Sequence, residues 1–414
     1  MKTIFLRLGG FAGFPLLGIL IPLLLLPVIA RVAGPSGWAS IVAAIAIGSF
    51  GATAILWGWN IRGTVLVAST TSAERRATLY GQSIVVRGML SVIVLPVVVL
   101  LTASLASPDV RWDAAAVAGA TAVSGFSPAW FCVGIGSPRL MGIFDTLPRV
   151  ISAVVALPLV AISGVISYYP VFLVLLTIVA VVVFRRVYFP RGTISRPGIA
   201  ESLGEMRRQL GSAGVNISGS AYSSVPVPIA TFRGPEVVAS VYSSADQLYR
   251  FGLFTTVALG NTFQGWTLEV AGRAQVRRHA AAFGSHLGLG VTGAAVITLL
   301  GPTASSLLFG PDVAATTMTC FLYGVSFLFI NLGTPLIRNL LIPAGKDVLV
   351  LLSTVVSAIA GITMMLSLSA PGSLTGIAVG VATSEAILFL LVLPAAVAAV
   401  RTLRTDAATS RTEG

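Results

Sequence analysis

Long apolar stretches alternate with short polar or charged segments along the whole chain. Each stretch has about 20 residues, the length that a helix needs to cross the hydrocarbon core of a bilayer. The eighth and tenth are the least regular, because each contains charge or proline. We place twelve such spans at residues 9–30, 38–60, 84–105, 113–135, 142–163, 165–184, 211–233, 237–262, 282–305, 313–341, 347–369 and 374–400. The pattern predicts an all-α polytopic membrane protein with about twelve transmembrane helices.

Basic residues gather in alternate loops. With the N-terminus in the cytoplasm, the outer loops contain only Arg31, Arg111 and Arg233, and Arg250 lies inside the eighth span. Every other Lys and Arg then falls on the inner side, as expected when cytoplasmic loops are enriched in positive charge. An odd number of spans would destroy this alternation, so we predict that both termini are cytoplasmic.

A weak internal repeat supports a division into two halves. The segment Gly58–Arg76 matches Gly260–Arg278 at a constant offset of 202 residues, with Gly, Gly, Leu, Arg and Arg at five equivalent positions. Both segments follow the second span of a predicted half, as in a parallel repeat. We therefore predict six-helix halves at 1–184 and 211–400, a basic cytoplasmic linker at 185–210 and a cytoplasmic tail at 401–414. The linker segment ESLGEMRRQL is typical of an amphipathic helix on the inner membrane surface.

Composition agrees with a membrane protein. The chain has 414 residues, of which 56% are hydrophobic and 10% charged, against about 25% charged residues in soluble domains. We interpret the net charge of +12 as a topology signal and as contacts for anionic lipids at the inner face, and expect no nucleic-acid partner. The two cysteines and two histidines form no disulfide or metal-binding pattern. We expect His279 and His286 at the surface, and no cofactor or metal.

Two charged residues in the eighth span are out of place in lipid. Asp246 and Arg250 are four residues apart, so on a helix they share a face and can pair. A charge at the centre of a membrane helix costs about 2.5–3.5 kcal/mol. Two alternatives remain open: a structural ion pair that locks two helices together, or a charged site that faces a cavity.

Further polar residues inside the spans are candidates for the same cavity. Arg149 lies four residues after Asp145 in the fifth span, and Glu385 lies near the middle of the twelfth. Glu385 could carry a proton, or it could be a neutral acid bonded to a neighbouring helix. Asn60 and Asn261, near the two repeated segments, are weaker candidates because asparagine often only bonds between membrane helices.

Four stretches resemble polysaccharide repeat-unit flippases, the O-antigen-type family of the multidrug/oligosaccharidyl-lipid/polysaccharide exporter superfamily. The stretches are LPVIARVAGPSGW (26–38), FSPAWFCVGIGSPRLMGIFDTLPRV (126–150), VYSSADQLYR (241–250) and NLGTPLIRNLLIPAGKD (331–347). They occur in the family's order. The chain departs from the family at Leu56 or Trp57, where members often have an acidic residue.

The resemblance implies a flippase in the bacterial inner membrane. It would move a polyprenyl-pyrophosphate-linked oligosaccharide from the inner to the outer leaflet by alternating access, working beside a glycan polymerase or glycosyltransferases of the same pathway. Arginine suits a pyrophosphate group because it is always charged and donates two parallel hydrogen bonds. We expect Arg250 and Arg149 to contact the headgroup and Arg31 to act at the outer mouth. Asp246 would orient Arg250, and Glu385 could couple transport to protons.

Two other functions fit the same pattern. A multidrug or organic-cation antiporter of the same superfamily needs acidic residues in its cavity, and a scaffold with this fold would transport nothing. We do not expect an enzyme, because the predicted outer loops are short and contain no histidine.

Overall fold

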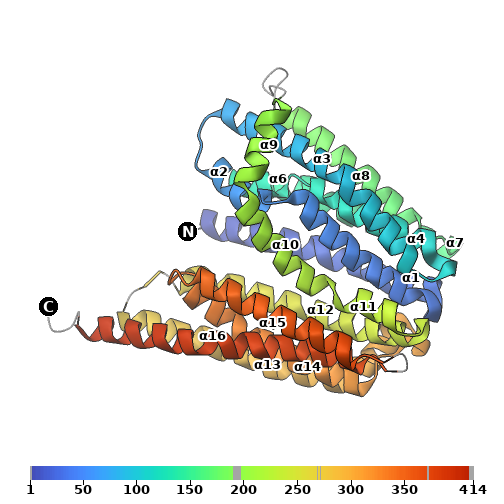
Figure 1. Ribbon diagram of the computed structural model, residues 1–414. Coiled ribbons are helices and arrows are strands. Elements are labelled where there is room, and N and C mark those ends of the chain that lie inside the picture. The colour runs from blue at the N-terminus through green and yellow to red at the C-terminus, as the bar shows by residue number, and fades with distance from the viewer. Residues whose placement is uncertain (1, 190–196, 268, 271, 371–372, 410–414) are drawn as a thin grey trace. The chain divides into compact units, whose positions relative to one another are not determined.

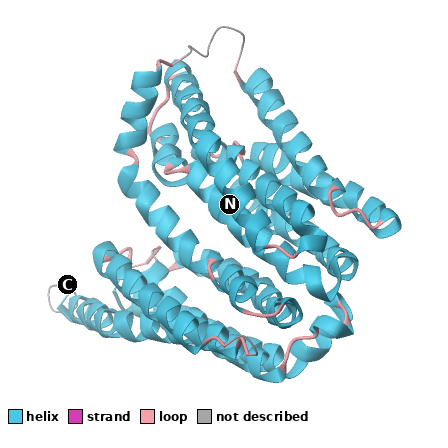
Figure 2. Cartoon of the chain, turned by 45° about the vertical axis from the view of Figure 1, so that its right-hand side comes forward, coloured by secondary structure: helices cyan, strands magenta, loops and turns pink. Residues whose placement is uncertain are grey.

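The computed structural model describes residues 2–189, 197–267, 269–270, 272–370 and 373–409. Within them the chain forms helices joined by loops, apart from an isolated β-bridge between Ala370 and Ser373 (Figures 1 and 2). The predicted all-α membrane fold is confirmed. The longer helices are α1 (Lys2–Leu56), α3 (Ala73–Leu105), α4 (Arg111–Val123), α7 (Leu147–Ser163), α8 (Tyr168–Tyr188), α9 (Ile199–Arg208), α10 (Leu210–Ser224), α12 (Glu236–Trp266), α13 (Gly272–Phe309), α14 (Thr317–Pro335), α15 (Asp347–Leu368) and α16 (Thr375–Thr409).

Shorter helical turns connect or extend these helices. They include α2 (Thr64–Ala68), α5 (Ala129–Gly134), α6 (Pro138–Met141), α11 (Pro226–Arg233) and the 3₁₀ turns η2 (Pro108–Val110), η3 (Ser124–Phe126) and η5 (Pro311–Val313). Three wide π-turns also occur, namely η1 (Trp59–Gly63), η4 (Gly142–Thr146) and η6 (Leu336–Leu341). Because π-turns are rare and frequently mark functional sites, these three are places to search for chemistry.

Each predicted span coincides with helix. Among the described residues, 9 helical segments are long and apolar enough to cross a membrane. Three predicted spans are not among them: 9–30, 211–233 and 237–262. The first lies largely before Leu24, where side chains are outside the described residues. The second is divided between α10 and α11 at Pro226. The third corresponds to α12, where polar side chains such as Asp246 and Arg250 lower the mean hydropathy.

A single glycine divides α1. Gly34 has φ 69° and ψ −178°, a backbone region that is essentially restricted to glycine. The helix on either side of it corresponds to the first and second predicted spans. A 55-residue helix would be about 80 Å long, whereas the hydrocarbon core is about 30 Å thick. The break at Gly34 therefore lets one continuous helical stretch supply two crossings.

The chain divides into two compact units, unit 1 (Met1–Thr231) and unit 2 (Phe232–Gly414). This boundary falls near the end of α11, between Thr231 and Phe232, while the sequence-based boundary, the segment 185–210, stays a prediction. In unit 1, Tyr80 is buried among Phe131, Phe184 and Phe189, with ring centroids 5.1–5.5 Å from its own. Unit 2 is built chiefly from α12, α13, α14, α15 and α16, with α13 against α14 and α15 against α16.

The amphipathic segment of the predicted linker forms α9 and docks on unit 1. Its Glu205 is buried, accepts a hydrogen bond from Arg208 at 2.8 Å and lies 3.7 Å from Arg62. Trp57, at the end of α1, donates its indole N–H to the Met206 carbonyl at 3.1 Å. These contacts hold α9 by its polar face.

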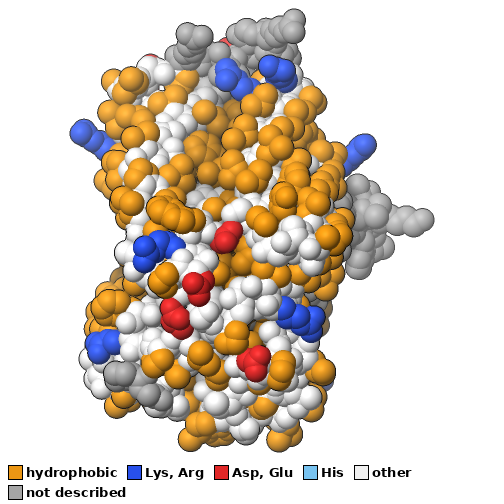
Figure 3. Space-filling model, turned by 90° about the vertical axis from the view of Figure 1, so that its right-hand side faces the viewer, with side chains coloured by type: hydrophobic (Ala, Val, Ile, Leu, Met, Phe, Trp, Pro, Cys, Tyr) orange, Lys and Arg blue, Asp and Glu red, His pale blue; other side chains and the backbone are white. Residues whose placement is uncertain are grey.

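The outside of each unit is apolar. Ile162 is 87% exposed, and Val92 and Leu299 are each 74% exposed. Hydrophobic side chains cover much of the face drawn in Figure 3. Because lipid tails are as apolar as these side chains, such surfaces are stable where the solvent is the bilayer.

In both repeated segments an arginine side chain donates a hydrogen bond to a main-chain carbonyl earlier in the same segment. Arg76 and Arg278 occupy equivalent positions, and each reaches back across its loop to a main-chain carbonyl, Arg76 to Val67 at 3.3 Å and Arg278 to Trp266 at 2.5 Å. Both segments connect one long helix to the next. The basic pair at the end of each repeat thus fastens the loop before it.

Candidate functional site

The pair predicted in the eighth span forms in unit 2. Arg250 Nε donates to Asp246 Oδ2 at 2.5 Å, within α12. The two side chains differ in exposure, at 2% for Asp246 and 29% for Arg250. The carboxylate is therefore inside the unit, while part of the guanidinium reaches its surface.

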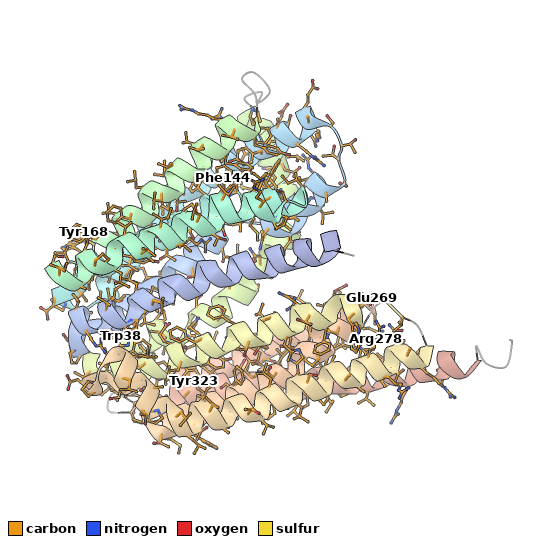
Figure 4. The ribbon with its side chains drawn as sticks, turned by 180° about the vertical axis from the view of Figure 1, so that it is seen from behind. Trp38, Phe144, Tyr168, Glu269, Arg278 and Tyr323 are labelled. Atoms are coloured by element: carbon orange, nitrogen blue, oxygen red, sulfur yellow. The ribbon has the colours of Figure 1, made fainter. Side chains whose placement is uncertain are left out.

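The other oxygen of Asp246 is hydrogen-bonded to the first of two linked tyrosines. The hydroxyl of Tyr323, on α14, donates to Asp246 Oδ1 at 2.9 Å. The hydroxyls of Tyr323 and Tyr242 are hydrogen-bonded at 2.6 Å. A phenol has one proton, so Tyr323 accepts from Tyr242 while it donates to the carboxylate. Tyr323, labelled in Figure 4, thereby links α14 to the charged pair on α12.

The geometry combines features of both alternatives left open for this pair. Asp246 joins two helices, as a structural ion pair does, and it also fixes the position of a partly exposed Arg250. A partly exposed guanidinium in a fixed position is a suitable donor for an anionic or polar ligand.

Unit 1 contains a second pair of the same kind. Arg149 Nη2 donates to Asp145 Oδ1 at 2.8 Å, and the side chains are 35% and 15% exposed. Ser127 Oγ donates to the same carboxylate oxygen at 2.6 Å. In both units, an aspartate receives hydrogen bonds from an arginine four residues later and from a hydroxyl on another element. The arginine is the more exposed partner each time.

Arg87 is a functional candidate that the sequence analysis assigned only to the basic inner side. It is completely buried on α3. Its Nη1 donates to the carbonyls of Gly125 at 3.2 Å and Ser127 at 3.1 Å, and its Nη2 to Ser83 Oγ at 2.9 Å. A charged group this deep in a membrane protein is costly unless it is fully bonded.

The sequence around Pro128 explains why Arg87 is needed. Proline drives the residue before it out of the helical region, and Ser127 has ψ 140°. The carbonyls of Gly125 and Ser127 thereby lose their helical partners, and the guanidinium of Arg87 replaces them. Ser127 uses its side chain for Asp145 and its carbonyl for Arg87, so the broken helix connects the buried arginine to the Asp145–Arg149 pair.

Glu385 differs from the two aspartates. It is 7% exposed on α16, and within the described part of the chain its carboxyl group has no hydrogen-bond or ion-pair partner. An isolated ionised carboxylate away from water is very unfavourable, so such a group is neutralised by a proton or by a cationic ligand.

The remaining predicted site residues do not join one cluster in the structure. Asn60 exchanges hydrogen bonds with Asn216 of α10 at 3.1 and 3.2 Å. Asn261 accepts from Arg338 Nη2, on η6, at 2.8 Å. Arg31 is exposed on α1, shortly before the break at Gly34. The first two bond between helices, as asparagine commonly does in membranes.

The expectation of surface histidines was wrong. His279 is 9% exposed and His286 is fully buried on α13. His286 Nδ1 lies 3.3 Å from Asn331 Oδ1 on α14. The early start of α13 at Gly272, before the predicted start at residue 282, brings His279 into the helix. His286 lies inside the predicted span, and the apolar pattern did not show that its side chain is on the packed face.

Comparisons by sequence find nothing: no family model and no curated protein matches this chain. Comparison of structures does find proteins of similar fold. The chain matches the inward-facing conformation of a multidrug resistance MATE family transporter of the MOP superfamily with a TM-score of 0.66 and 15% identity, over 94% of this chain and 99% of that one.

Two further matches also span the whole length. A eukaryotic MATE transporter, AtDTX14, matches with a TM-score of 0.55 and 14% identity, over 97% of this chain and 98% of that chain. A MOP superfamily transporter from Pyrococcus furiosus Vc1, described as having a binding pocket of reverse polarity that suggests a different function, matches with a TM-score of 0.56 and 14% identity, over 95% and 96%.

The chain therefore has the fold of these MOP superfamily transporters. This fold agrees with the one implied by the resemblance of the sequence motifs. The finer expectation, the O-antigen-type flippase family, is not supported, since the matched structures are MATE and related transporters.

Proposed function

We propose that this chain is a multi-pass membrane transporter that exports amphipathic organic cations of the multidrug class in exchange for protons. The full-length structural match to a multidrug MATE transporter is the observation that supports it most directly. A second support comes from the acidic residues. Asp145 and Asp246 are already paired with arginines, which leaves Glu385 as the buried carboxylate available to exchange a proton for a cation.

The mechanism follows from that exchange. A carboxylate in apolar surroundings is stable with either a proton or an organic cation bound, and unstable with neither. Binding one therefore favours release of the other, which couples the two movements during alternating access. A proton gradient directed inward would then drive the cation outward. We place the protein in the bacterial inner membrane as part of the same proposal.

The test is efflux of a fluorescent organic cation from proteoliposomes under an imposed pH gradient. We expect gradient-driven transport by the wild type and transport at the level of empty vesicles for Glu385→Gln. The matched control is Glu236→Gln, an exposed acid in the first turn of α12, which should transport normally. Equal transport by both variants would exclude Glu385 as the coupling group.

One observation favours a second candidate, flipping of a polyprenyl-pyrophosphate-linked oligosaccharide. Arg149 and Arg250 are partly exposed and positioned by buried aspartates, and the matched transporter from Pyrococcus furiosus is described as having reverse pocket polarity. The same vesicles loaded with a labelled lipid-linked glycan separate the candidates. In the flippase case, Arg250→Gln abolishes transfer, Arg250→Lys retains part of it, and the organic cation is not transported.

A further inference from the structure

Unit 2 contains an apolar pocket that the proposed transport function does not use. Its volume is about 470 Å³, and it lies between α13, the α14–η6 junction and α16. This volume is within the range of small-molecule sites, about 300–1,000 Å³. Val397, 43% exposed, and the exposed Ala280 line it, so the pocket opens on the surface of the unit.

The helices form the pocket by placing small or irregular residues opposite one another. On α13, positions 276, 279, 280 and 283 share one face, and on α16, positions 393, 396, 397, 400 and 401 share another, as helical spacing requires. Ala282 and Ala396 are buried and leave space where larger side chains would fill it. The third wall of the pocket is the α14–η6 junction, where Pro335 and the wide π-turn that follows it interrupt the regular helix.

The polar groups of the lining lie toward one end. Arg401, exposed near the end of α16, and His279, about two turns into α13, are the polar side chains among the described lining residues, and none of those residues is acidic. Figure 1 shows that the start of α13 and the end of α16 lie at the same end of this unit. Arg273, Arg277 and Lys346 are exposed in the first turns of α13 and just before α15.

We propose that this pocket binds one acyl chain of an anionic phospholipid, with the phosphate held at Arg401 beside the basic start of α13. The apolar walls select an acyl chain over a soluble anion. The arginine and the lack of a described acidic lining residue select against an organic cation. Basic residues at a membrane surface attract anionic lipids, and here they stand next to a cavity that accepts the tail.

The test uses the purified full chain in neutral detergent and measures its thermal unfolding midpoint. A ligand that binds only the folded state raises this midpoint with concentration. We expect dioctanoyl phosphatidylglycerol to raise it, and dioctanoyl phosphatidylcholine, glycerol phosphate and a fluorescent organic cation to leave it unchanged at the same concentrations. Equal shifts with both phospholipids would overturn the headgroup assignment, and a shift with glycerol phosphate alone would overturn the acyl-chain assignment.

Variants locate the site. Val397→Trp, from the exposed wall, should fill the pocket and remove the phosphatidylglycerol shift. Val356→Trp on α15, at a residue 51% exposed that does not line the pocket, is the control. If Val397→Trp does not fold, Ala280→Phe serves as the second pocket-filling variant. It fills the pocket from α13 and should also remove the phosphatidylglycerol shift. Arg401→Gln should weaken apparent affinity about fivefold, the effect of one basic residue at a membrane surface. An unchanged shift in the pocket-filling variants would place the lipid elsewhere.

Discussion

Two aspartate–arginine pairs, one in each unit, show how single residues are arranged to hold charge in lipid. Each aspartate is the buried partner and has a second hydrogen bond, from Tyr323 in unit 2 and from Ser127 in unit 1. The two carboxylates differ in burial, since the side chain of Asp246 is 2% exposed and that of Asp145 is 15% exposed. Removing either acid leaves a guanidinium without its partner, and the cost depends on how much water can reach it.

The first prediction compares these pairs. Asp246→Ala should lower the free energy of unfolding by about 3–5 kcal/mol, the cost of breaking a buried ion pair, and Asp145→Ala by distinctly less, because water reaches its site. Denaturant unfolding of the purified protein measures both. A larger loss for Asp145→Ala would contradict the ranking by burial.

The second prediction concerns the tyrosine relay. Tyr323→Phe removes two hydrogen bonds, one with Asp246 and one with Tyr242. It should cost about 2 kcal/mol, at about 1 kcal/mol for each net hydrogen bond. In a double-mutant cycle, the cost of Tyr323→Phe should shrink once Asp246 is replaced by Asn, because the two side chains are in contact. Strictly additive effects would mean that the Tyr323–Asp246 bond contributes nothing. Tyr168→Phe, in unit 1, is the control substitution.

At the scale of elements, helix breaks organise both units. Ser127–Pro128 lies inside the fourth predicted span and Gly34 lies between the first and the second, so proline and glycine mark where helix is interrupted. The sequence does not predict what satisfies a broken end. Arg87 does so for Gly125 and Ser127 from α3, far away along the chain. Counting charges by loop placed Arg87 at the inner surface because that count contains no information about tertiary contacts.

The third prediction isolates the backbone at such a break. Neither Gly34 nor Gly88 has an atom within 4 Å of where a Cβ would stand, and only Gly34 has positive φ, at 69°. Gly34→Ala should therefore destabilise the protein by about 1–3 kcal/mol. Gly88→Ala, inside α3, should stabilise it by about 0.5–1 kcal/mol. If the two substitutions changed the free energy of unfolding in the same direction, the positive φ at Gly34 would not be the reason that glycine is needed there.

At the scale of the whole molecule, apolar periodicity was sufficient to predict the helical membrane architecture, because about 20 apolar residues have few alternatives in lipid. The individual motifs led to the fold but do not determine the family, since one fold can carry very different pocket chemistry. The matched structure from Pyrococcus furiosus, described as having a pocket of reverse polarity, is an example. The burial of Glu385 and of the histidines depends on which helix faces meet, which local sequence does not encode.

The fourth prediction tests the topology. Both native cysteines, Cys132 and Cys320, are buried, so engineered cysteines report with little background. Ser72→Cys should react with a membrane-impermeant maleimide only from the cytoplasmic side, and Asp109→Cys only from the outside. Labelling of both from one side would show that the distribution of basic residues does not set the orientation.

The interruption at Gly34 also has a consequence for biosynthesis. The two arms of α1 leave the ribosome as one helical stretch with a single non-helical residue between them. A translocon therefore receives them as a hairpin with almost no loop, and neither arm can be released into lipid for long before its partner arrives. We expect the two spans joined at Gly34 to enter the bilayer together, so that the orientation of one fixes the orientation of the other.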